Sequence, residues 1–582
     1  MKVALVQMDA KIGDFNANAA KALQHIQSAA AAGARLILLP ELVLCGYPPM
    51  DLLDQPSFVQ QDEQAFRRLQ ASLAAQLPPE TAVAIGHIGR NPYKTGRILR
   101  NVVSVIVNGQ VVFEQAKTLL PSYDVFDETR YFEPARERKV FEYEGHRIGF
   151  AICEDIWHEA APSPGLRYPV DPLADLLDAG ADCILVPSAS PYQLDKLELR
   201  MQLCRKLALT GGITVAYCNA TGANDSLVFD GRSFVTDSSG RLTRLAAFDE
   251  EILYFDLPAA APKAYESNAA ATAAAGNASG DKTARPAAID PAQAAVPVIP
   301  HRLDELEAAL VAGIRGYMSK CGFSTAHLGI SGGIDSAIVA VLIAKAIGPQ
   351  NLTCIGLPSR YSSEGSVKDS EELCRNLSCR METISIEKVF DSMLATMDSH
   401  FAGLPFNLTE ENMQARLRGN ILMAWSNKFN SMLFTTGNKS EIAVGYCTLY
   451  GDMCGAFNPI GDLFKTEVYD LCEHIYRREG LIPRAIIDKA PSAELRPDQK
   501  DQDSLPPYLE LDGILRLHIE QNQDRAGIVA AGFNDAIVSR VLTLCGRAEY
   551  KRRQAAPLIK VSPRAFGLGR RIPMARTLHE IL

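Results

Sequence analysis

Three reactive side chains in the first half of the chain each follow an apolar run: Glu41, Lys117 and Cys153. A thiol has a pKa near ~8.5 and is a weak nucleophile until a base or a positive charge raises its thiolate fraction. Glu41 could accept the thiol proton, and Lys117 could stabilise the oxyanion that forms when the thiolate attacks an amide carbonyl. Taken singly, each also has an ordinary structural interpretation, as a small buried side chain, a cap or a surface charge.

A glycine-rich segment in the second half could bind phosphate. It lies between an apolar run (326–330) and a helix-like stretch (337–347) and consists of Gly329, Ile330, Ser331, Gly332, Gly333, Ile334, Asp335 and Ser336. Small residues let the backbone approach an anion, and the amides that open the next helix direct partial positive charge toward it. No lysine follows the glycines, so the P-loop pattern is absent. Asp335 instead offers a carboxylate that suits Mg²⁺ on a pyrophosphate, although a glycine-rich turn by itself is often only structural.

Polar segments further along add candidate ligand contacts. Asn412 and Arg416 are four residues apart and would share a helix face, where an arginine can bind phosphate through its planar fork. Thr436 and Glu441 follow a predicted central strand, where they would face a nucleotide and its metal, although Glu441 could equally be a first-turn residue favoured by the helix dipole. The basic residues 551–553 suit an anionic ligand or form an ordinary surface patch.

Two series of α/β elements must position these residues. In the first half, β-rich runs alternate with helical patterns, and Asn108-Gly109 predicts a hairpin because both residues suit positive φ. This pattern predicts a layered α/β domain. The second half alternates helices with strands, which predicts a doubly wound parallel sheet with ligands at the carboxyl ends of its strands. The predicted strands are 3–8, 36–39, 82–88, 102–107, 111–115, 148–153, 184–186, 213–218, 326–330, 352–357, 380–386 and 432–436.

An Ala-rich segment separates the two halves. Residues 258–300 hold almost no large apolar side chain, so this stretch cannot bury enough surface to fold alone and is interpreted as a linker. The predicted domains are therefore 1–257 and 301–582.

The bulk composition limits the class of protein. With 47% hydrophobic and 22% charged residues, the 582-residue chain is typical of a soluble globular protein. A net charge of -9 argues against a nucleic-acid surface, and the longest apolar run is too short to span a bilayer. The 13 cysteines show no Cys-x-x-Cys pair or zinc pattern, which fits a reduced cytoplasm. We expect a cytoplasmic homo-oligomer without membrane or nucleic-acid partners.

Longer motifs surround the three reactive residues of the first half. Pro-Glu-Leu-x-Leu-x-Gly-Tyr-Pro-Pro contains Glu41, and Pro-Ser-Tyr-x-Val-Phe-Asp-Glu-x-Arg-Tyr-Phe follows Lys117. With these motifs, residues 1–257 resemble the nitrilase superfamily. The resemblance implies an α-β-β-α sandwich that hydrolyses C–N bonds through a thioester, with Glu41, Lys117 and Cys153 as catalytic residues.

The glutaminase branch of that superfamily implies further contacts. Tyr123, Ser190 and Lys196 would hold the substrate glutamine, although the match at Ser190 and Lys196 is looser. Alternatively, Tyr123 is a packed aromatic residue and Lys196 a charge on a helix face.

The second half resembles the ATP pyrophosphatases, which cleave ATP between the α- and β-phosphates. With Glu-Asn-x-Gln-Ala-Arg at 411–416, Thr-Gly-Asn-Lys-Ser-Glu at 436–441 and Pro-Ser-Ala-Glu-Leu-Arg-Pro at 491–497, the whole chain except the linker resembles the glutamine-dependent NAD synthetases. The resemblance implies ATP at 329–336 and Thr436, deamido-NAD at Asn412, Glu441 and Lys551, and Mg²⁺ at Asp335 and Glu441.

The same resemblance implies a reaction sequence. ATP would adenylate the nicotinate carboxylate of deamido-NAD, and ammonia released from glutamine would displace AMP to give NAD. A rival interpretation is a related amidotransferase that acts on another carboxylate, and a second rival is a nucleotide-sensing module with an inert amidase half. The intact set Glu41, Lys117 and Cys153 argues against the inert module.

Overall fold

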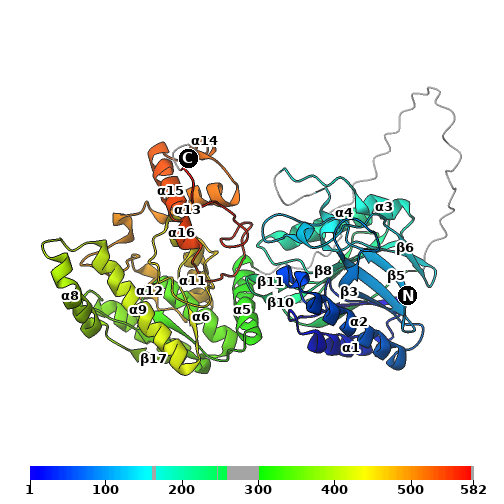
Figure 1. Cartoon of the computed structure of the whole chain (residues 1–582), viewed down its shortest axis with the longest axis horizontal. Coiled ribbons are helices and arrows are strands. Elements are labelled where there is room, and N and C mark those ends of the chain that lie inside the picture. Colours follow the sequence, from blue (N-terminus) through cyan, green and yellow to red (C-terminus); the bar gives the residue numbers. More distant parts are fainter. Residues whose placement is uncertain (160–164, 246, 259–300, 578–582) are drawn as a thin grey trace.

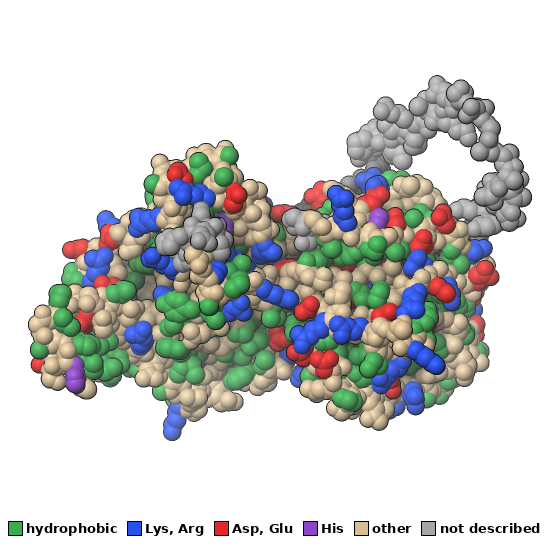
Figure 2. Space-filling model, turned by 45° about the horizontal axis from the view of Figure 1, so that its top comes forward, with side chains coloured by type: hydrophobic (Ala, Val, Ile, Leu, Met, Phe, Trp, Pro, Cys, Tyr) green, Lys and Arg blue, Asp and Glu red, His purple; other side chains and the backbone are tan. Residues whose placement is uncertain are grey.

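The computed structural model describes residues 1–159, 165–245, 247–258 and 301–577, which form two α/β domains lying side by side (Figure 1). Except for Pro258, the predicted linker lies outside the described residues. Within the described ranges, no helix combines the length and apolar character needed to cross a membrane. Lys/Arg and Asp/Glu side chains are interspersed on the face of the molecule that Figure 2 shows.

The first domain contains two six-stranded sheets. One has the order β14-β1-β2-β3-β4-β5 and the other β13-β12-β9-β8-β7-β6. The strands are β1 (Lys2–Gln7), β2 (Leu36–Leu38), β3 (Ala82–Arg90), β4 (Leu99–Val107), β5 (Gln110–Ala116), β6 (Val140–Tyr143), β7 (His146–Phe150), β8 (Cys183–Ser188), β9 (Thr214–Asn219), β12 (Phe234–Thr236), β13 (Leu242–Arg244) and β14 (Glu251–Asp256). Asn108 and Gly109 both have positive φ and join β4 to β5, which confirms the predicted hairpin.

The two sheets pack face to face between helices. Alternate residues of β1 point to opposite sides: Val3 and Leu5 lie in the core between the sheets, whereas Ala4 and Val6 lie in the core beneath the helices. The helices are α1 (Phe15–Ala31) and α2 (Pro56–Gln76) on one sheet and α3 (Pro172–Asp178) and α4 (Lys196–Gly211) on the other. The predicted α-β-β-α sandwich is confirmed.

The second domain is built on a four-stranded parallel sheet, as predicted. Its order is β17 (Arg380–Thr383), β16 (Leu352–Gly356), β15 (Ala326–Ile330) and β18 (Met432–Phe434). The expectation that the 432–436 strand is central was wrong, because β18 lies at the edge of the four-stranded sheet. Within the described residues, isolated bridges alone extend beyond it, between Phe434 and Phe457 and between Asn458 and Leu558.

Twelve helices with α labels surround this sheet among the described residues. They are α5 (Arg302–Lys320), α6 (Ile334–Ile347), α7 (Glu364–Leu377), α8 (Glu387–Phe401), α9 (Leu408–Phe429), α10 (Lys439–Val444), α11 (Lys465–Glu479), α12 (Arg484–Asp488), α13 (Tyr508–Leu515), α14 (Arg525–Ala530), α15 (Asp535–Arg547) and α16 (Glu549–Arg552). The nearly all-apolar helix α6 is buried at the centre of the domain, and its sequence shows why: it carries charge only at Asp335 and Lys345.

Helix α5 joins the domains by packing on the hairpin of β10 (Thr221–Asn224) and β11 (Leu227–Asp230) (Figure 1). Gly316 permits this close approach, since a Cβ there would lie 2.8 Å from the Ala223 Cβ. The Lys320 ammonium donates to Asn224 Oδ1 at 2.8 Å and pairs with Asp9 at 2.5 Å. The contact is therefore close-packed and partly ionic.

Candidate active sites

The first candidate site is built where strands of the first domain end. Glu41 follows β2 and Lys117 follows β5 directly, and both side chains are buried. The Lys117 Nζ donates to Glu41 Oε1 at 2.7 Å and to Glu128 Oε1 at 2.8 Å. A buried ammonium is costly unless it is paired, so two carboxylates hold this one in its charged form and in a single position.

Both oxygens of the Glu41 carboxylate accept hydrogen bonds. Besides Lys117, the Asn101 Nδ2 donates to its Oε1 at 2.7 Å, and the backbone N–H of Ala189 donates to its Oε2 at 3.0 Å. These donors come from β4 and from the end of β8, on different sheets of the sandwich. Closure of the sandwich therefore orients the carboxylate.

Cys153 opens a short 3-10 helix, Cys153–Trp157, after β7. The predicted strand 148–153 ends at Phe150, and Cys153 itself has φ +46°, a left-handed conformation that is costly for a residue with a Cβ. Burial and the nearby Glu41 charge raise the pKa of the thiol well above its ordinary value, against the opposing effects of Lys117 and Ser188. Cys153 therefore rests as a thiol, and its attack on a carbonyl needs a base such as Glu41.

Glu128 is a site residue that the sequence analysis missed. It accepts hydrogen bonds from Lys117 and, at 2.8 Å, from the Tyr47 hydroxyl. Burial and the Glu41 charge raise the pKa of this carboxyl to about 7, although Lys117 acts in the opposite direction. The sequence did mark this residue for attention, because Glu128 belongs to the motif that follows Lys117.

The three residues predicted to bind glutamine lie around Cys153. The Tyr123 hydroxyl donates to the Glu154 carboxylate at 3.0 Å, and the Ser190 amide donates to Asn219 Oδ1 at 2.9 Å. Lys196 opens α4, with its ammonium 5.4 Å from the centre of the Trp157 ring.

The charges of Lys196 and Glu154 interact with one another and lie near Cys153 in this buried site. Burial and Arg200 lower the pKa of Lys196 to about 8, while the nearby Cys153 and Glu154 act to raise it. No ion pair of Lys196 is found among the described residues. Burial raises the pKa of Glu154, whose carboxylate also accepts from the Tyr168 hydroxyl at 2.6 Å. An anionic group near Lys196 would therefore find an available cation.

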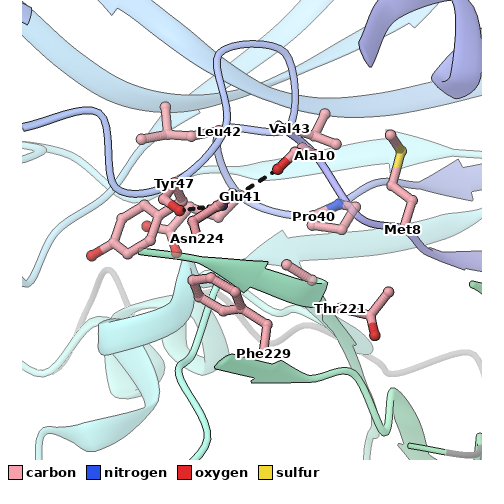
Figure 3. Close-up of a pocket in the computed structure, with 11 residues that line it drawn as sticks. Met8, Ala10, Pro40, Glu41, Leu42, Val43, Tyr47, Thr221, Asn224 and Phe229 are labelled. Carbon is pink, nitrogen blue, oxygen red and sulfur yellow. Dashed lines mark hydrogen bonds between the residues drawn. The ribbon is translucent and has the colours of Figure 1, made fainter. Parts of the chain in front are cut away.

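A small cavity lies behind Glu41 (Figure 3), and its lining includes Asn224 of β10, the strand on which α5 packs. Its lining comprises Met8, Ala10, Pro40, Glu41, Leu42, Val43, Tyr47, Ala220, Thr221, Asn224 and Phe229. The Asn224 Nδ2 donates to the backbone oxygens of Tyr47 (2.9 Å) and Ala10 (3.3 Å), and its Oδ1 accepts from Lys320 of the second domain. The cavity thus connects the surroundings of Glu41 with the domain interface.

A second cavity, of about 300 Å³, lies beside Glu128 and is shared by the two domains. Its lining comprises Tyr47, Pro48, Pro49, Met50, Asp51, Leu53, Val125, Phe126, Asp127, Glu128, Arg130, Tyr131, Phe132, Leu568 and Arg571. Arg571 pairs with Asp127 at 3.5 Å. A segment near the chain's end therefore contacts the loop that carries Glu128.

The glycine-rich segment of the second domain forms the turn between β15 and α6, as its sequence predicted. Gly332 has φ +74°, and a Cβ there would lie 2.4 Å from the Ser366 carbonyl oxygen, so only glycine fits. The hydroxyls of Ser331 and Ser336 lie 3.1 Å apart and brace the turn. The first backbone N–H groups of α6 therefore lie at the carboxyl end of the sheet.

Asp335 and Glu441, predicted to bind a metal, are brought together across the strand ends. Lys465, which the sequence analysis missed, pairs with the Asp335 carboxylate and lies 3.4 Å from Glu441 Oε1. The Asn438 Nδ2 donates to Asp335 Oδ1 at 3.0 Å. Lys465 is 130 positions from Asp335 in the chain, and no local pattern marked it.

Negative charge is in excess at this second site. Burial and the charges of Asp335, Asp501 and Asp452 raise the pKa of Glu441 to about 8, although Lys465 opposes the change. Glu441 also has the structural role considered for it, since it forms a capping box with Asn438 at the start of α10. Several carboxylates lie close together here, with less positive than negative charge around them. Such a set of oxygen ligands suits a divalent cation such as Mg²⁺.

The residues predicted to bind deamido-NAD meet around the loop that follows α10. Asn412 Oδ1, on α9, accepts from the Thr448 hydroxyl at 2.7 Å. The Lys551 ammonium, on α16, donates to the carbonyl oxygens of Gly445 (2.7 Å) and Cys447 (2.6 Å). Lys551 is therefore not a solvated surface charge. Thr436 follows β18 and is half-buried.

Arg418 is a further cation of this site. It lies on α9, two residues after the motif at 411–416, and its Nε donates to the Leu357 carbonyl at 3.0 Å, beyond the carboxyl end of β16. Burial lowers its pKa to about 10. Among the described residues it forms no ion pair, so an anionic group could engage its fork.

Each half of the chain is similar to known proteins. The carbon-nitrogen hydrolase family matches residues 2–265, and the NAD synthase family matches residues 306–555. A glutamine-dependent NAD(+) synthetase of Synechocystis sp. is 42% identical over 585 residues, covering 99% of each chain, and one of Rhodobacter capsulatus is 41% identical, covering 98% of each. The structure of glutamine-dependent NAD+ synthetase from Acinetobacter baumannii in complex with ADP is 32% identical over 98% of both chains, with a TM-score of 0.72.

Proposed function

The chain belongs to the glutamine-dependent NAD(+) synthetase family, and from that premise we propose how its two sites divide the reaction. The protein is a ligase that uses ATP to amidate deamido-NAD to NAD with nitrogen from glutamine. A related amidotransferase acting on another carboxylate is not favoured. The observation that carries this conclusion is similarity over the full length, so that both halves match together rather than one alone.

In the first domain, Cys153 attacks the side-chain amide carbon of glutamine while Glu41 takes the thiol proton. Lys117 stabilises the oxyanion, and Glu41 returns the proton to the leaving ammonia. Water then hydrolyses the thioester to give glutamate, with Glu41 as the base. Support for these roles comes from the contact of Lys117 with Glu41 and from the raised pKa of Cys153, which makes a base necessary.

The substrate amino acid would be held by its two charged groups. Lys196, which lacks an ion pair among the described residues, would bind the α-carboxylate, and Tyr123 and Ser190 would position the remainder of the molecule. The Glu154 carboxylate, which Tyr123 orients, would bind the α-ammonium.

Ammonia would leave the first site through the cavity behind Glu41. Free ammonia is mostly protonated in neutral water, and ammonium is not a nucleophile, so a shielded route has kinetic value. Asn224, which lines this cavity and contacts Lys320 of α5, would mark where the route reaches the second domain.

In the second domain, a carboxylate must be activated because its delocalised charge makes it a poor electrophile. The amides of residues 329–336, with Thr436, would hold the phosphates of ATP while the nicotinate carboxylate attacks the α-phosphorus, so that AMP is attached to the carboxylate and pyrophosphate leaves. Asp335 and Glu441 would hold Mg²⁺, which neutralises charge on the departing pyrophosphate. Lys465 would hold these two carboxylates in place when no cation is bound.

Deamido-NAD would lie against the loop that follows α10. Asn412, Glu441 and Lys551 surround that loop, and Lys551 already orders its backbone through two carbonyl contacts.

A cytoplasmic location for the reaction is supported by the cysteines, all of which are free.

A paired assay tests this assignment. The enzyme is incubated with ATP, Mg²⁺ and deamido-NAD, with either glutamine or ammonium salt as nitrogen donor, and the products are identified by mass. We expect NAD, AMP and pyrophosphate from both donors and glutamate from glutamine alone. Formation of ADP and phosphate, or no NAD with ammonium salt, would contradict the proposal.

A further inference from the structure

Three cysteine sulfurs meet in the second domain, away from both active sites. Cys354 lies on β16, Cys374 in the last turn of α7, and Cys379 in the turn before β17. Their sulfur atoms all lie within 4.8 Å of one another, and those of Cys354 and Cys379 are 3.8 Å apart. The sequence shows no local pattern for this cluster, because Cys354 lies 25 positions from Cys379.

The spacing of these sulfurs is that of ligands around one ion. Zinc–thiolate bonds of ~2.3 Å place neighbouring sulfurs ~3.8 Å apart in a tetrahedral site and ~4.0 Å apart in a trigonal one. The Cys374 and Cys379 pair also has the short Cys-x₄-Cys spacing of many thiolate sites. Little movement would therefore convert the thiol cluster into a coordination site.

The surroundings favour a cation over a free thiolate. Cys374 lies at the C-terminal end of α7, where the helix dipole attracts positive charge. Met381 pairs with Cys354 in the β16–β17 register, so both side chains lie on the same face of the sheet.

We propose that Cys354, Cys374 and Cys379 form a binding site for one thiophilic metal ion, of the class of Zn²⁺, Cd²⁺ or Cu⁺. Binding replaces three S–H protons with three metal–sulfur bonds, and the protons leave to solvent, without any redox change. The site joins β16, α7 and β17, so its effect would be on the stability of this β-α-β unit. It lies near the amino-terminal end of the sheet, opposite the end that carries Asp335.

Apart from the Mg²⁺ site at Asp335 and Glu441, a second cluster of three His and carboxylate side chains among the described residues could hold a metal, but it carries no proposal. Its members are His301, Asp304 and His474. The Asp304 carboxylate already pairs with the guanidinium of Arg478, whose positive charge opposes a cation there.

A Cd²⁺ titration tests the proposal. The full-length enzyme carrying Cys153→Ala, so that the catalytic thiol does not contribute, is reduced, freed of metal with a chelator and titrated with Cd²⁺. We expect sulfur-to-cadmium charge-transfer absorbance that saturates at one ion per chain, and that Zn²⁺ suppresses by competition. The same ion should raise the temperature of unfolding.

Two further substitutions identify the site. In the same background, Cys379→Ser should weaken Cd²⁺ binding by about a hundredfold or more, because one of three thiolates is lost. Cys321→Ser, at an exposed cysteine, should leave binding unchanged. If the Cys379→Ser protein proves unfolded, the parent titration still decides. Absence of charge-transfer absorbance in the parent, its persistence in folded Cys379→Ser, or loss of two thiols to a disulfide in place of metal binding would overturn the proposal.

Discussion

The two candidate active sites differ in how complete they are before any ligand binds. In the first domain, the side chains of Lys117 and Glu41 are 1% and 0% exposed, and donors on two sheets surround the Glu41 carboxylate. In the second domain, the side chains of Asp335 and Glu441 are 18% and 17% exposed. A single lysine, Lys465, balances both of these carboxylates.

The difference follows from the chemistry at each site. A covalent nucleophile requires its base and its oxyanion stabiliser at fixed positions, and burial within a closed sandwich provides these. A nucleotide site must receive phosphates and a cation, so it keeps partly exposed carboxylates and an excess of charge that the substrates neutralise. We therefore expect substitutions of single functional groups to lower activity at the first site. At the second site, activity and stability should depend also on pH and on the concentration of cations.

The largest expected effect separates the two sites. Cys153→Ala should lower glutamine-dependent NAD formation by about a thousandfold or more, because the nucleophile is lost, while high ammonium salt still supports synthesis. The two rates are measured with deamido-NAD as acceptor, and Cys321→Ala serves as control. Equal loss with both donors would show that the sites are not separable.

Asp335→Asn should lower NAD formation by about a hundredfold or more with either donor, because the adenylation step serves both. The matched control is Asp398→Asn, an exposed aspartate on α8, which should retain full activity. Activity retained in Asp335→Asn would remove this residue from the metal and phosphate site.

Glu128→Gln tests whether the first site depends on its second carboxylate. The substitution keeps the shape of the side chain but removes one of the two charges that hold Lys117, so glutamine-dependent kcat should fall about tenfold to a hundredfold. Ammonium-dependent activity should not change. Glu137→Gln, at an exposed surface glutamate, is the control, and a similar decline in that variant would argue against a specific role for Glu128.

The pH dependence of stability should report on the second site. The pKa of Glu441 is raised to about 8 in the folded protein, above the ordinary carboxyl range, so its contribution to stability is full at low pH and is lost as the pH rises through about 8. Glu441→Gln cannot ionise. The difference in Tm between variant and wild type, without ligands, should therefore shift in favour of the variant by about 2–4 °C between roughly pH 6 and pH 9. A difference that is constant across this range would exclude the assignment.

The smallest expected effect concerns the interface. Lys320→Met removes the contacts with Asp9 and Asn224 beside the cavity behind Glu41, so some ammonia should escape. The NAD formed per glutamate released should fall about twofold, without loss of ammonium-dependent rate. Lys388→Met, on the exposed face of α8, provides the control. An unchanged ratio in Lys320→Met would place the route elsewhere.

The parts of each site that could be predicted from sequence are those marked by local patterns. Strand ends located Glu41 and Lys117, and the turn between an apolar strand and an apolar helix located Gly332. Glu128 lay within a recognised motif, but nothing in the motif indicated its contact with Lys117. Lys465 had no local signal, because its role arises only when α11 packs against the start of α6.

The sequence by itself determined the α/β class of both domains, most of their central strands and the identity of residues at strand ends, because hydrophobic periodicity and turn residues act over a few positions. It did not mark β6 or the strands β10 to β14. Only the tertiary structure decided that β18 lies at an edge, that Glu128 and Lys465 complete the charge networks, and that three distant cysteines meet. These features depend on packing between elements far apart in the chain, and the burial that creates such contacts also sets the pKa values on which the proposed chemistry depends.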